Sequence, residues 1–188
     1  MRKLIVFNHV SLDGYFVDAH GSMMWAKAHH QDPEWDAFVA ENAKGEGPLL
    51  FGRVTYELMI QYWPTPLAAQ HDAVVADRMN KLPKIVFSKT LDKVTWNTKL
   101  MKGDLISEVR KLKSEPGEGI AILGSGRIVA QLAKERLIDE YHLVVNPVIL
   151  GAGRTMFEGV KDHLNLKLTK SRAFRNGNVV LAYEPATA

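Results

Sequence analysis

The 188-residue sequence contains no cysteine. Disulfides and Cys-ligated metal sites are therefore excluded, and an oxidising compartment would offer the chain nothing. Long apolar runs are also missing, because the run at residues 4–7 ends at Asn8 and is too short for a signal peptide. No segment approaches the roughly 20 apolar residues that a membrane helix needs. We therefore expect a soluble, cytoplasmic protein without a membrane partner.

An excess of one charge is nearly absent. The 24 Lys and Arg residues almost balance the 21 Asp and Glu residues, for a net charge of +3, and they are dispersed along the chain. This pattern gives little support to nucleic-acid binding and suits a small polyanionic ligand equally well. A content of 46% hydrophobic and 24% charged residues is typical of globular proteins. The length and the lack of a linker predict one domain over residues 1–188.

Short β-branched runs alternate with helix-period stretches, which indicates an α/β domain with a largely parallel sheet. The predicted strands cover residues 4–10, 48–51, 84–88, 93–96, 119–123, 141–145, 164–171 and 179–183. No helix separates the last two strands, and the Asn-Gly pair at residues 176–177 predicts a hairpin turn there. We expect a three-layer α/β/α sandwich with a central mixed, mostly parallel sheet and an antiparallel C-terminal hairpin.

Helices are predicted over residues 33–43, 54–61 and 103–113 and after Gly126. The first is marked by Asp32 as its N-cap and by a proline in its first turn. The third and fourth carry apolar stripes at helical spacing. Residues 11–31 and 62–71 are the least regular stretches, and long loops in compact domains are often functional.

Three predicted strand ends carry groups suited to phosphate. The clearest is the turn Gly124, Ser125, Gly126 and Arg127, followed by Ile128, where glycines allow a close backbone approach and a helix N-terminus attracts an anion. An ordinary glycine-rich βα turn explains this segment by itself equally well. The second is Gly52, Arg53 and Thr55, for which a helix cap beside a surface arginine is the simpler explanation.

The third strand end carries Ser88 and Lys89, which alone are an unremarkable polar end. In open α/β sheets, however, ligands bind outside the carboxyl ends of the strands, so three such ends predict one shared site. A dinucleotide with three phosphates would use all three. Arg53, Arg127 and Lys89 exceed what a pyrophosphate needs, which favours NADPH over NADH as the cofactor.

Several longer motifs resemble the dihydrofolate reductase superfamily. These are VSLDGYF, LLFGRVTYE, FSKT, ILGSGR and NPVILGAGRTMFEG, and they span the chain from about Lys3 to Tyr183. The sequence is most similar to the branch that resembles the reductase (C-terminal) domain of the bifunctional riboflavin biosynthesis protein, the RibD C-terminal domain. The resemblance implies a dihydrofolate reductase-like fold, NADPH as cofactor and hydride transfer to a small heterocycle.

The resemblance also assigns roles to residues. It implies that Gly52, Arg53 and Thr55 hold cofactor phosphates and that Ser88 and Lys89 face the 2′-phosphate. The turn from Gly124 to Ile128 would hold the pyrophosphate. The nicotinamide would lie near the first strand and the following loop, around Val10, Asp13, Gly14 and Val17.

The substrate side is less explicit. Asp13, Asp32 and Asp36 are the candidate catalytic acids, but a loop-capping turn explains Asp13 as well, and a solvated helix N-terminus explains the other two. The RibD-type SLDG motif is usually followed by a lysine, whereas Tyr15 and Phe16 stand here. The adjacent His29 and His30 would point apart on a helix, so no metal site is expected.

The sequence therefore predicts an NADPH-dependent reductase of a small heterocycle, with a riboflavin-pathway aminouracil as one substrate and dihydrofolate as the alternative. A homodimer is an option. A second class of function, a catalytically silent nucleotide-binding module, stays open because hydride transfer needs little from the protein beyond orientation, exclusion of water and a proton source.

Overall fold

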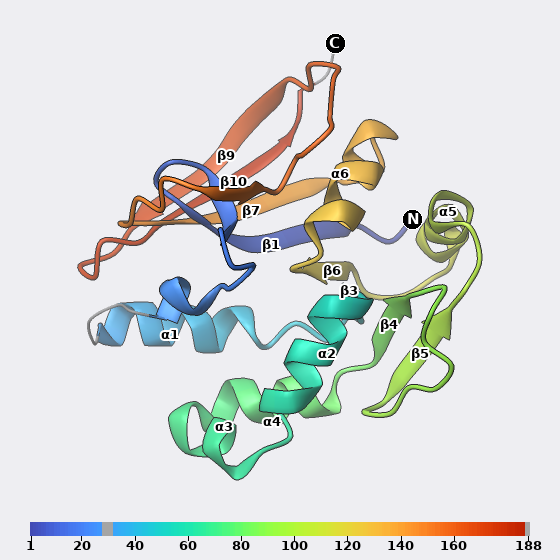
Figure 1. Ribbon diagram of the computed structural model, residues 1–188, viewed down its shortest axis with the longest axis horizontal. Helices are drawn as coiled ribbons and strands as arrows, with labels where there is room; N and C mark the ends of the chain where they lie inside the picture. The colour runs from blue at the N-terminus through green and yellow to red at the C-terminus, as the bar shows by residue number, and fades with distance from the viewer. Residues whose placement is uncertain (28–31, 187–188) are drawn as a thin grey trace.

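The computed structural model describes residues 1–27 and 32–186, so His29 and His30 lie outside the described residues. Its centre is an eight-stranded sheet (Figure 1). In spatial order the strands are β5 (Thr98–Met101), β4 (Lys84–Phe87), β3 (Leu49–Gly52), β6 (Ile120–Leu123), β1 (Leu4–Ser11), β7 (Glu140–Asn146), β10 (Val179–Pro185) and β9 (Leu166–Ala173). The first six run parallel, and β10 is antiparallel to both neighbours. The predicted mixed, mostly parallel sheet is confirmed.

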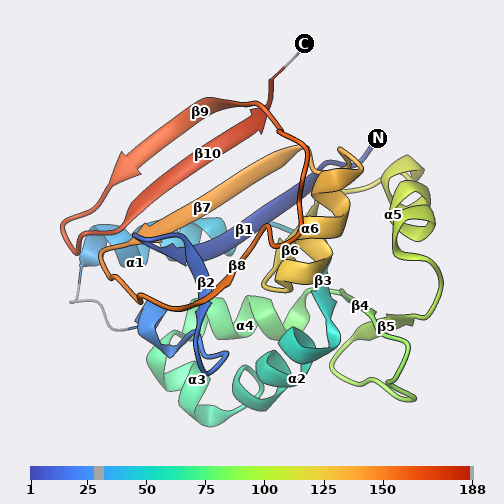
Figure 2. The same ribbon diagram turned by 45° about the horizontal axis from the view of Figure 1, so that its top comes forward.

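Helices cover both faces of the sheet, which confirms the three-layer arrangement (Figures 1 and 2). They are α1 (Pro33–Asn42), α2 (Arg53–Tyr62), α3 (Pro66–His71), α4 (Ala73–Lys81), α5 (Leu105–Ser114), α6 (Gly126–Lys134) and the 3₁₀ turn η1 (Met24–Lys27). Side chains alternate along β3, so Phe51 joins the core with Tyr56 of α2. Its neighbour Leu50 joins the other core, with Val109 of α5 and Leu132 of α6.

The fourth predicted strand, residues 93–96, is wrong. The Tyr56 hydroxyl accepts a hydrogen bond from the Thr95 N–H (2.9 Å) and lies 3.3 Å from the Thr95 carbonyl oxygen, which holds this segment out of the sheet. Trp96 and Asn97 follow with φ of 62° and 51°, values that turn the chain and end any extended run. Pairing with β4 begins only at Thr98.

Both stretches predicted to be irregular contain regular structure. Residues 11–31 include β2 (Tyr15–Asp18), which pairs antiparallel with a second short strand that the sequence analysis missed, β8 (Gly153–Thr155). Residues 62–71 include α3, and α4 follows directly. The sequence could have indicated both helices, because threonine and aspartate are preferred N-cap residues. Thr65 and Asp72 occupy these positions, and each accepts a hydrogen bond from an N–H of the first turn.

The C-terminal hairpin is confirmed, with β9 and β10 joined through the Asn-Gly turn. Gly177 has a φ of +88°, where a side chain would be strained, and its N–H donates to the Phe174 carbonyl. The Asn176 N–H donates to the buried Asp32 carboxylate at 3.1 Å. The turn is therefore attached to the N-terminus of α1.

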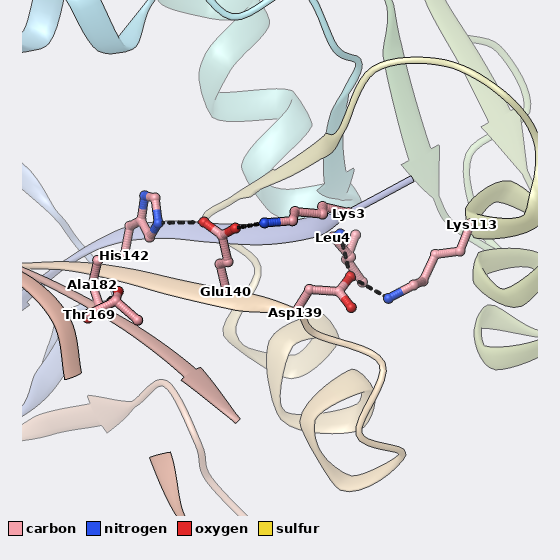
Figure 3. A network of polar contacts seen from close by, with 8 residues as sticks. All are labelled: Lys3, Leu4, Lys113, Asp139, Glu140, His142, Thr169 and Ala182. Carbon is pink, nitrogen blue, oxygen red and sulfur yellow. Dashed lines mark hydrogen bonds and ion pairs between the residues drawn. The ribbon is translucent and has the colours of Figure 1, made fainter. Parts of the chain in front are cut away.

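Polar contacts at the amino ends of β1 and β7 join these two strands to each other and to α5 (Figure 3). The Glu140 carboxylate lies 2.6 Å from Lys3 Nζ and 3.0 Å from His142 Nε2. Asp139 pairs with Lys113 and accepts the Leu4 N–H at 2.7 Å. Because β1 and β7 are parallel, this network lies at the opposite edge of the sheet from their carboxyl ends.

Candidate functional site

The glycine-containing turns after β3 and β6 form one unit at the carboxyl edge of the sheet. These strands are neighbours, with Leu50 opposite Ile122. The Gly52 N–H donates to Ser125 Oγ at 2.6 Å, and the Ser125 N–H donates to Thr55 Oγ1 at 3.0 Å. The structure thus brings together two motifs that the sequence suggested separately.

The helices that follow these turns begin without a side-chain cap. Ser125 is the N-cap residue of α6, but its hydroxyl faces Gly52 and Thr55, and Gly52 at the start of α2 has no side chain. In the described ranges every other α-helix has a capping carboxylate or hydroxyl. First-turn N–H groups carry partial positive charge and bind anions. Two uncapped helix N-termini at neighbouring strand ends are thus chemically suited to phosphates.

Close packing explains why glycine stands at two positions of these turns. A Cβ at Gly124 would lie 2.7 Å from Thr55 Cγ2, and this residue has a φ of +67°, in the left-handed region. A Cβ at Gly52 would lie 3.1 Å from Ser125 Oγ. Gly126 differs, since its Cβ would meet Phe16 at an ordinary 3.4 Å.

Asn8 belongs to the site and was missed by the sequence analysis. It is buried in β1, where its Oδ1 accepts the Gly124 N–H at 2.6 Å and its Nδ2 donates to Met156 Sδ at 3.1 Å. It therefore holds the glycine-rich turn against the segment after β8. The available signal was an asparagine that interrupts an apolar run within a predicted strand, since a buried polar side chain needs hydrogen-bond partners.

The cationic groups of the site are exposed. Arg53 lies on α2 and pairs with Glu57 at 2.9 Å, with 46% of its side chain accessible. Arg127 is exposed on α6, while the adjacent Ile128 is buried in the core. Among the residues that the structure describes, none encloses either guanidinium, so both can meet a phosphate.

Ser88 and Lys89 follow β4, the next strand beyond β3, so all three predicted strand ends are neighbours. Ser88 Oγ accepts the N–H groups of Thr90 and Leu91, both at 3.1 Å, and so forms a turn. Lys89 is exposed beside that turn. The order β4, β3, β6 arranges Lys89, Arg53 and Arg127 along one edge.

The loops after β1 and β7 are joined by Asp13. Its carboxylate accepts the Ser11 hydroxyl at 2.6 Å, the Gly151 N–H at 2.8 Å and the Leu150 N–H at 3.1 Å. The pKa of Asp13 is lowered, first by the Ser11 hydrogen bond and also by these two backbone N–H groups, against the opposing effect of burial. Gly14 follows with a φ of +84°. The SLDG and VILGAG motifs therefore form one structural unit.

Strands β2 and β8 extend that unit toward α6. Val10 at the end of β1 and Val17 in β2 are both buried. Phe16 and Met156 share a core cluster with Ile128, and both lie against Gly126. Val17 belongs to the same cluster, and β2 therefore borders the glycine-rich turn through Phe16.

The two acids at the start of α1 have different surroundings. Asp32 is buried, which raises its pKa, but the N–H groups of Asn176, Glu34 and Trp35 outweigh this effect and the pKa is lowered. The predicted N-cap role of Asp32 is confirmed. Asp36 is exposed in the first turn, and within the described residues its carboxylate accepts no hydrogen bond.

Comparison with known proteins identifies the family. The model of the RibD C-terminal domain matches residues 2–180. The chain belongs to this family. The uncharacterized protein YyaP of Bacillus subtilis (strain 168) is 29% identical over 182 residues, which cover 97% of this chain and 94% of YyaP.

Solved structures with a similar fold include a putative riboflavin biosynthesis protein and a dihydrofolate reductase. A putative riboflavin biosynthesis protein from Shewanella sp. PV-4 is 25% identical, with a TM-score of 0.77 over 98% of this chain and 99% of its own. The dihydrofolate reductase of Enterococcus faecalis, determined as a complex with NADP(H), is 14% identical with a TM-score of 0.66 over 98% of this chain and 97% of its own. The fold of the RibD C-terminal domain protein is thus dihydrofolate reductase-like, and its family supports a reductase.

None of the helices in the described ranges is long and apolar enough to cross a membrane.

Proposed function

We propose that this RibD C-terminal domain protein is an NADPH-dependent reductase that transfers a hydride to a small heterocycle. The observation that carries the proposal is the pair of uncapped helix N-termini, α2 and α6, joined through Thr55 and Ser125 at the carboxyl edge of the sheet. Such an arrangement binds phosphate groups through backbone N–H donors and the helix dipoles. Family membership supports the same conclusion.

The residues present fit the cofactor. Gly52 and Gly124 let the two turns pack closely through Ser125 and Thr55. Gly126 and Ile128 begin α6 beside Phe16, so that the first N–H groups of both helices would face a pyrophosphate together. Arg53 and Arg127 would pair with phosphate oxygens, and Ser88 and Lys89 with the 2′-phosphate. Val10, Gly14 and Val17 would border the nicotinamide. The bound cofactor would supply the hydride.

The proton would come from a carboxyl group or from water. The pKa of Asp13 is lowered by the Ser11 hydroxyl first and by backbone N–H groups as well, and the pKa of Asp32 is lowered by backbone N–H groups that outweigh its burial, so both are poor acids at neutral pH. Asp36 is exposed and accepts no such hydrogen bond from the described residues. Of the three candidates, Asp36 is the one whose side chain is open to an approaching ring, and we propose it, or water, as the proton donor.

The substrate that we propose is a riboflavin-type aminouracil or a related ring, with dihydrofolate as the alternative. The name of the Shewanella protein favours the first. The side chains after SLDG are a half-buried Tyr15 and a buried Phe16, so no lysine is available there for a ribose phosphate. We further propose a cytoplasmic protein that acts on small molecules rather than nucleic acid, with a homodimer as an option.

The test is titration of the protein with NADPH and NADH, followed by NADPH oxidation with a panel of pyrimidines and pteridines. We expect saturable NADPH binding and turnover with at least one ring. Thr55→Val, which removes the hydroxyl at the junction of the two turns, should weaken NADPH binding. Lack of NADPH binding would refute the proposal, and binding without turnover of any ring would favour the silent module.

A further inference from the structure

Asp13 connects two loops that are far apart in the sequence. Its partners Leu150 and Gly151 are 137 and 138 positions away, and they are consecutive residues whose N–H groups both point at the same carboxylate. Successive backbone N–H groups of this kind form a concavity that favours an anion. Asp13 fills this concavity from the opposite loop, and Gly151 has a φ of +71°, in the left-handed region.

Further bonds make the two loops one unit. The Leu12 N–H donates to the Val148 carbonyl at 2.8 Å, and Ser11 Oγ, which donates to Asp13, accepts the Tyr15 N–H at 2.9 Å. Beyond this junction β2 pairs with β8, with Val17 opposite Arg154. We call residues 11–18 and 148–156 the flap. Asp13 lies at the end of the flap where both segments leave the central sheet.

The flap contacts the glycine-rich turn directly. A Cβ at Gly126 would lie 3.4 Å from the ring of Phe16 and 3.6 Å from the Met156 backbone, so the start of α6 lies against the flap. Met156 Sδ also accepts a hydrogen bond from Asn8 Nδ2, and Oδ1 of the same Asn8 side chain accepts the Gly124 N–H. A displacement of the flap would therefore be transmitted to the turn that presents the first N–H groups of α6.

We propose that Asp13 is a positioning residue that clamps the flap and thereby holds the α6 N-terminus in the geometry for the cofactor pyrophosphate; this inference rests on the proposed function. Its carboxylate acts through backbone N–H groups and touches no reacting atom. The role needs an ionised side chain that accepts three hydrogen bonds, whereas a general acid needs a protonated one. The two roles therefore predict different effects of the same substitution.

The experiment compares the full-length protein with Asp13→Asn and with Asp72→Asn as a matched control. Asp72 lies outside the flap, where its carboxylate accepts the Val75 N–H at 3.0 Å at the start of α4. Three quantities are measured: amide hydrogen exchange of peptides covering residues 148–156, the NADPH dissociation constant, and kcat against pH with the best heterocycle.

Asp13→Asn should speed exchange in residues 148–156 by roughly tenfold and weaken NADPH by roughly tenfold, because charge-assisted hydrogen bonds are lost. At saturating NADPH, kcat should stay within about threefold and the shape of its pH profile should not change. Asp72→Asn should leave exchange at 148–156 and NADPH affinity as in the wild type.

Two results would overturn the inference. One is unchanged exchange at residues 148–156 in Asp13→Asn. The other is intact NADPH affinity with a loss of kcat by a factor of roughly 100 or more and a vanished limb of the pH profile, which would make Asp13 a general acid. A wild-type protein that binds no NADPH would refute the proposed function and with it the cofactor role of the clamp, whereas the exchange comparison would still decide whether Asp13 holds the flap.

Discussion

The hydroxyl oxygens of Ser125 and Thr55 lie 2.9 Å apart and share a hydrogen bond, although 70 positions separate the two residues. This bond joins the turn after β3 to the turn after β6 and directs the Ser125 side chain away from the N–H groups of α6. The first turn of that helix therefore stays free of a side-chain cap. The proposed phosphate site depends on this relationship.

Substitutions at Gly124 and Gly126, in the turn after β6, should affect different properties: the first should lower stability and the second should lower NADPH binding. Gly124→Ala places a Cβ 2.7 Å from Thr55 Cγ2 at a φ of +67°, so we expect a loss of roughly 1–3 kcal/mol in the free energy of unfolding. Gly126→Val should keep a near-normal free energy of unfolding, since a Cβ there meets Phe16 and Met156 at ordinary distances, but it should lose NADPH binding, because the added bulk would push the flap away from the start of α6. Urea unfolding and NADPH titration measure both effects. Wild-type NADPH affinity in Gly126→Val would show that the turn is only structural.

Selectivity for NADPH should depend on Lys89. A charge-assisted contact with the 2′-phosphate is worth about 1.5–3 kcal/mol, so Lys89→Ala should weaken NADPH by about tenfold or more and leave NADH nearly unchanged. Lys99 on β5 is exposed as well and provides the matched control, Lys99→Ala, which should alter neither affinity. Equal losses for both cofactors in Lys89→Ala would exclude the 2′-phosphate role.

Single substitutions can distinguish the roles of Asp32 and Asp36 at the start of α1. Asp36→Asn should lower kcat by a factor of roughly 100 to 10,000 with unchanged NADPH affinity, if Asp36 supplies the proton. Asp32→Asn retains a side chain that can cap α1, whereas Asp32→Ala removes the cap and should lower the melting temperature by roughly 2–4 °C. Full turnover in Asp36→Asn would transfer the role to water or to another residue.

The buried Lys84 should make stability depend on pH. Its Nζ donates to the carbonyls of Asn80 and Leu82 at 3.2 and 2.7 Å, and burial lowers its pKa from 10.5 to about 8. Between these values the unfolded chain binds a proton that the folded protein has released, so stability should rise with pH from about 8 to 10. The rise is at most about tenfold in the folding equilibrium constant per pH unit.

Lys84→Met should abolish this dependence, which chemical denaturation at pH 8, 9 and 10 would measure. The range stops near pH 10 because burial raises the pKa of Tyr141 to about 12, and stability then falls as the unfolded tyrosine ionises. A slope that persists in Lys84→Met would assign the effect to other groups.

The positions of the strands were only partly predictable from the sequence. Alternating apolar runs located seven of the eight long-sheet strands, and the Asn-Gly pair located the hairpin, because both signals depend on residues close in sequence. The error at residues 93–96 arose from the Tyr56 hydroxyl, which comes from a helix about 40 positions earlier. Strands β2 and β8 were missed because each is short and pairs only with the other.

The sequence by itself determined which residues could meet a phosphate, since glycine, serine, threonine and arginine at strand ends have this chemistry in any fold of this class. Tertiary structure decided which of them act together. Ser125 was directed to Thr55 rather than to its own helix, Asp13 was bound to Leu150 and Gly151, and the buried Asn8 was placed between two motifs. These contacts link residues about 70 to 148 positions apart. Local sequence patterns cannot contain them, because the partners meet only when the parallel strands align their carboxyl ends at one edge.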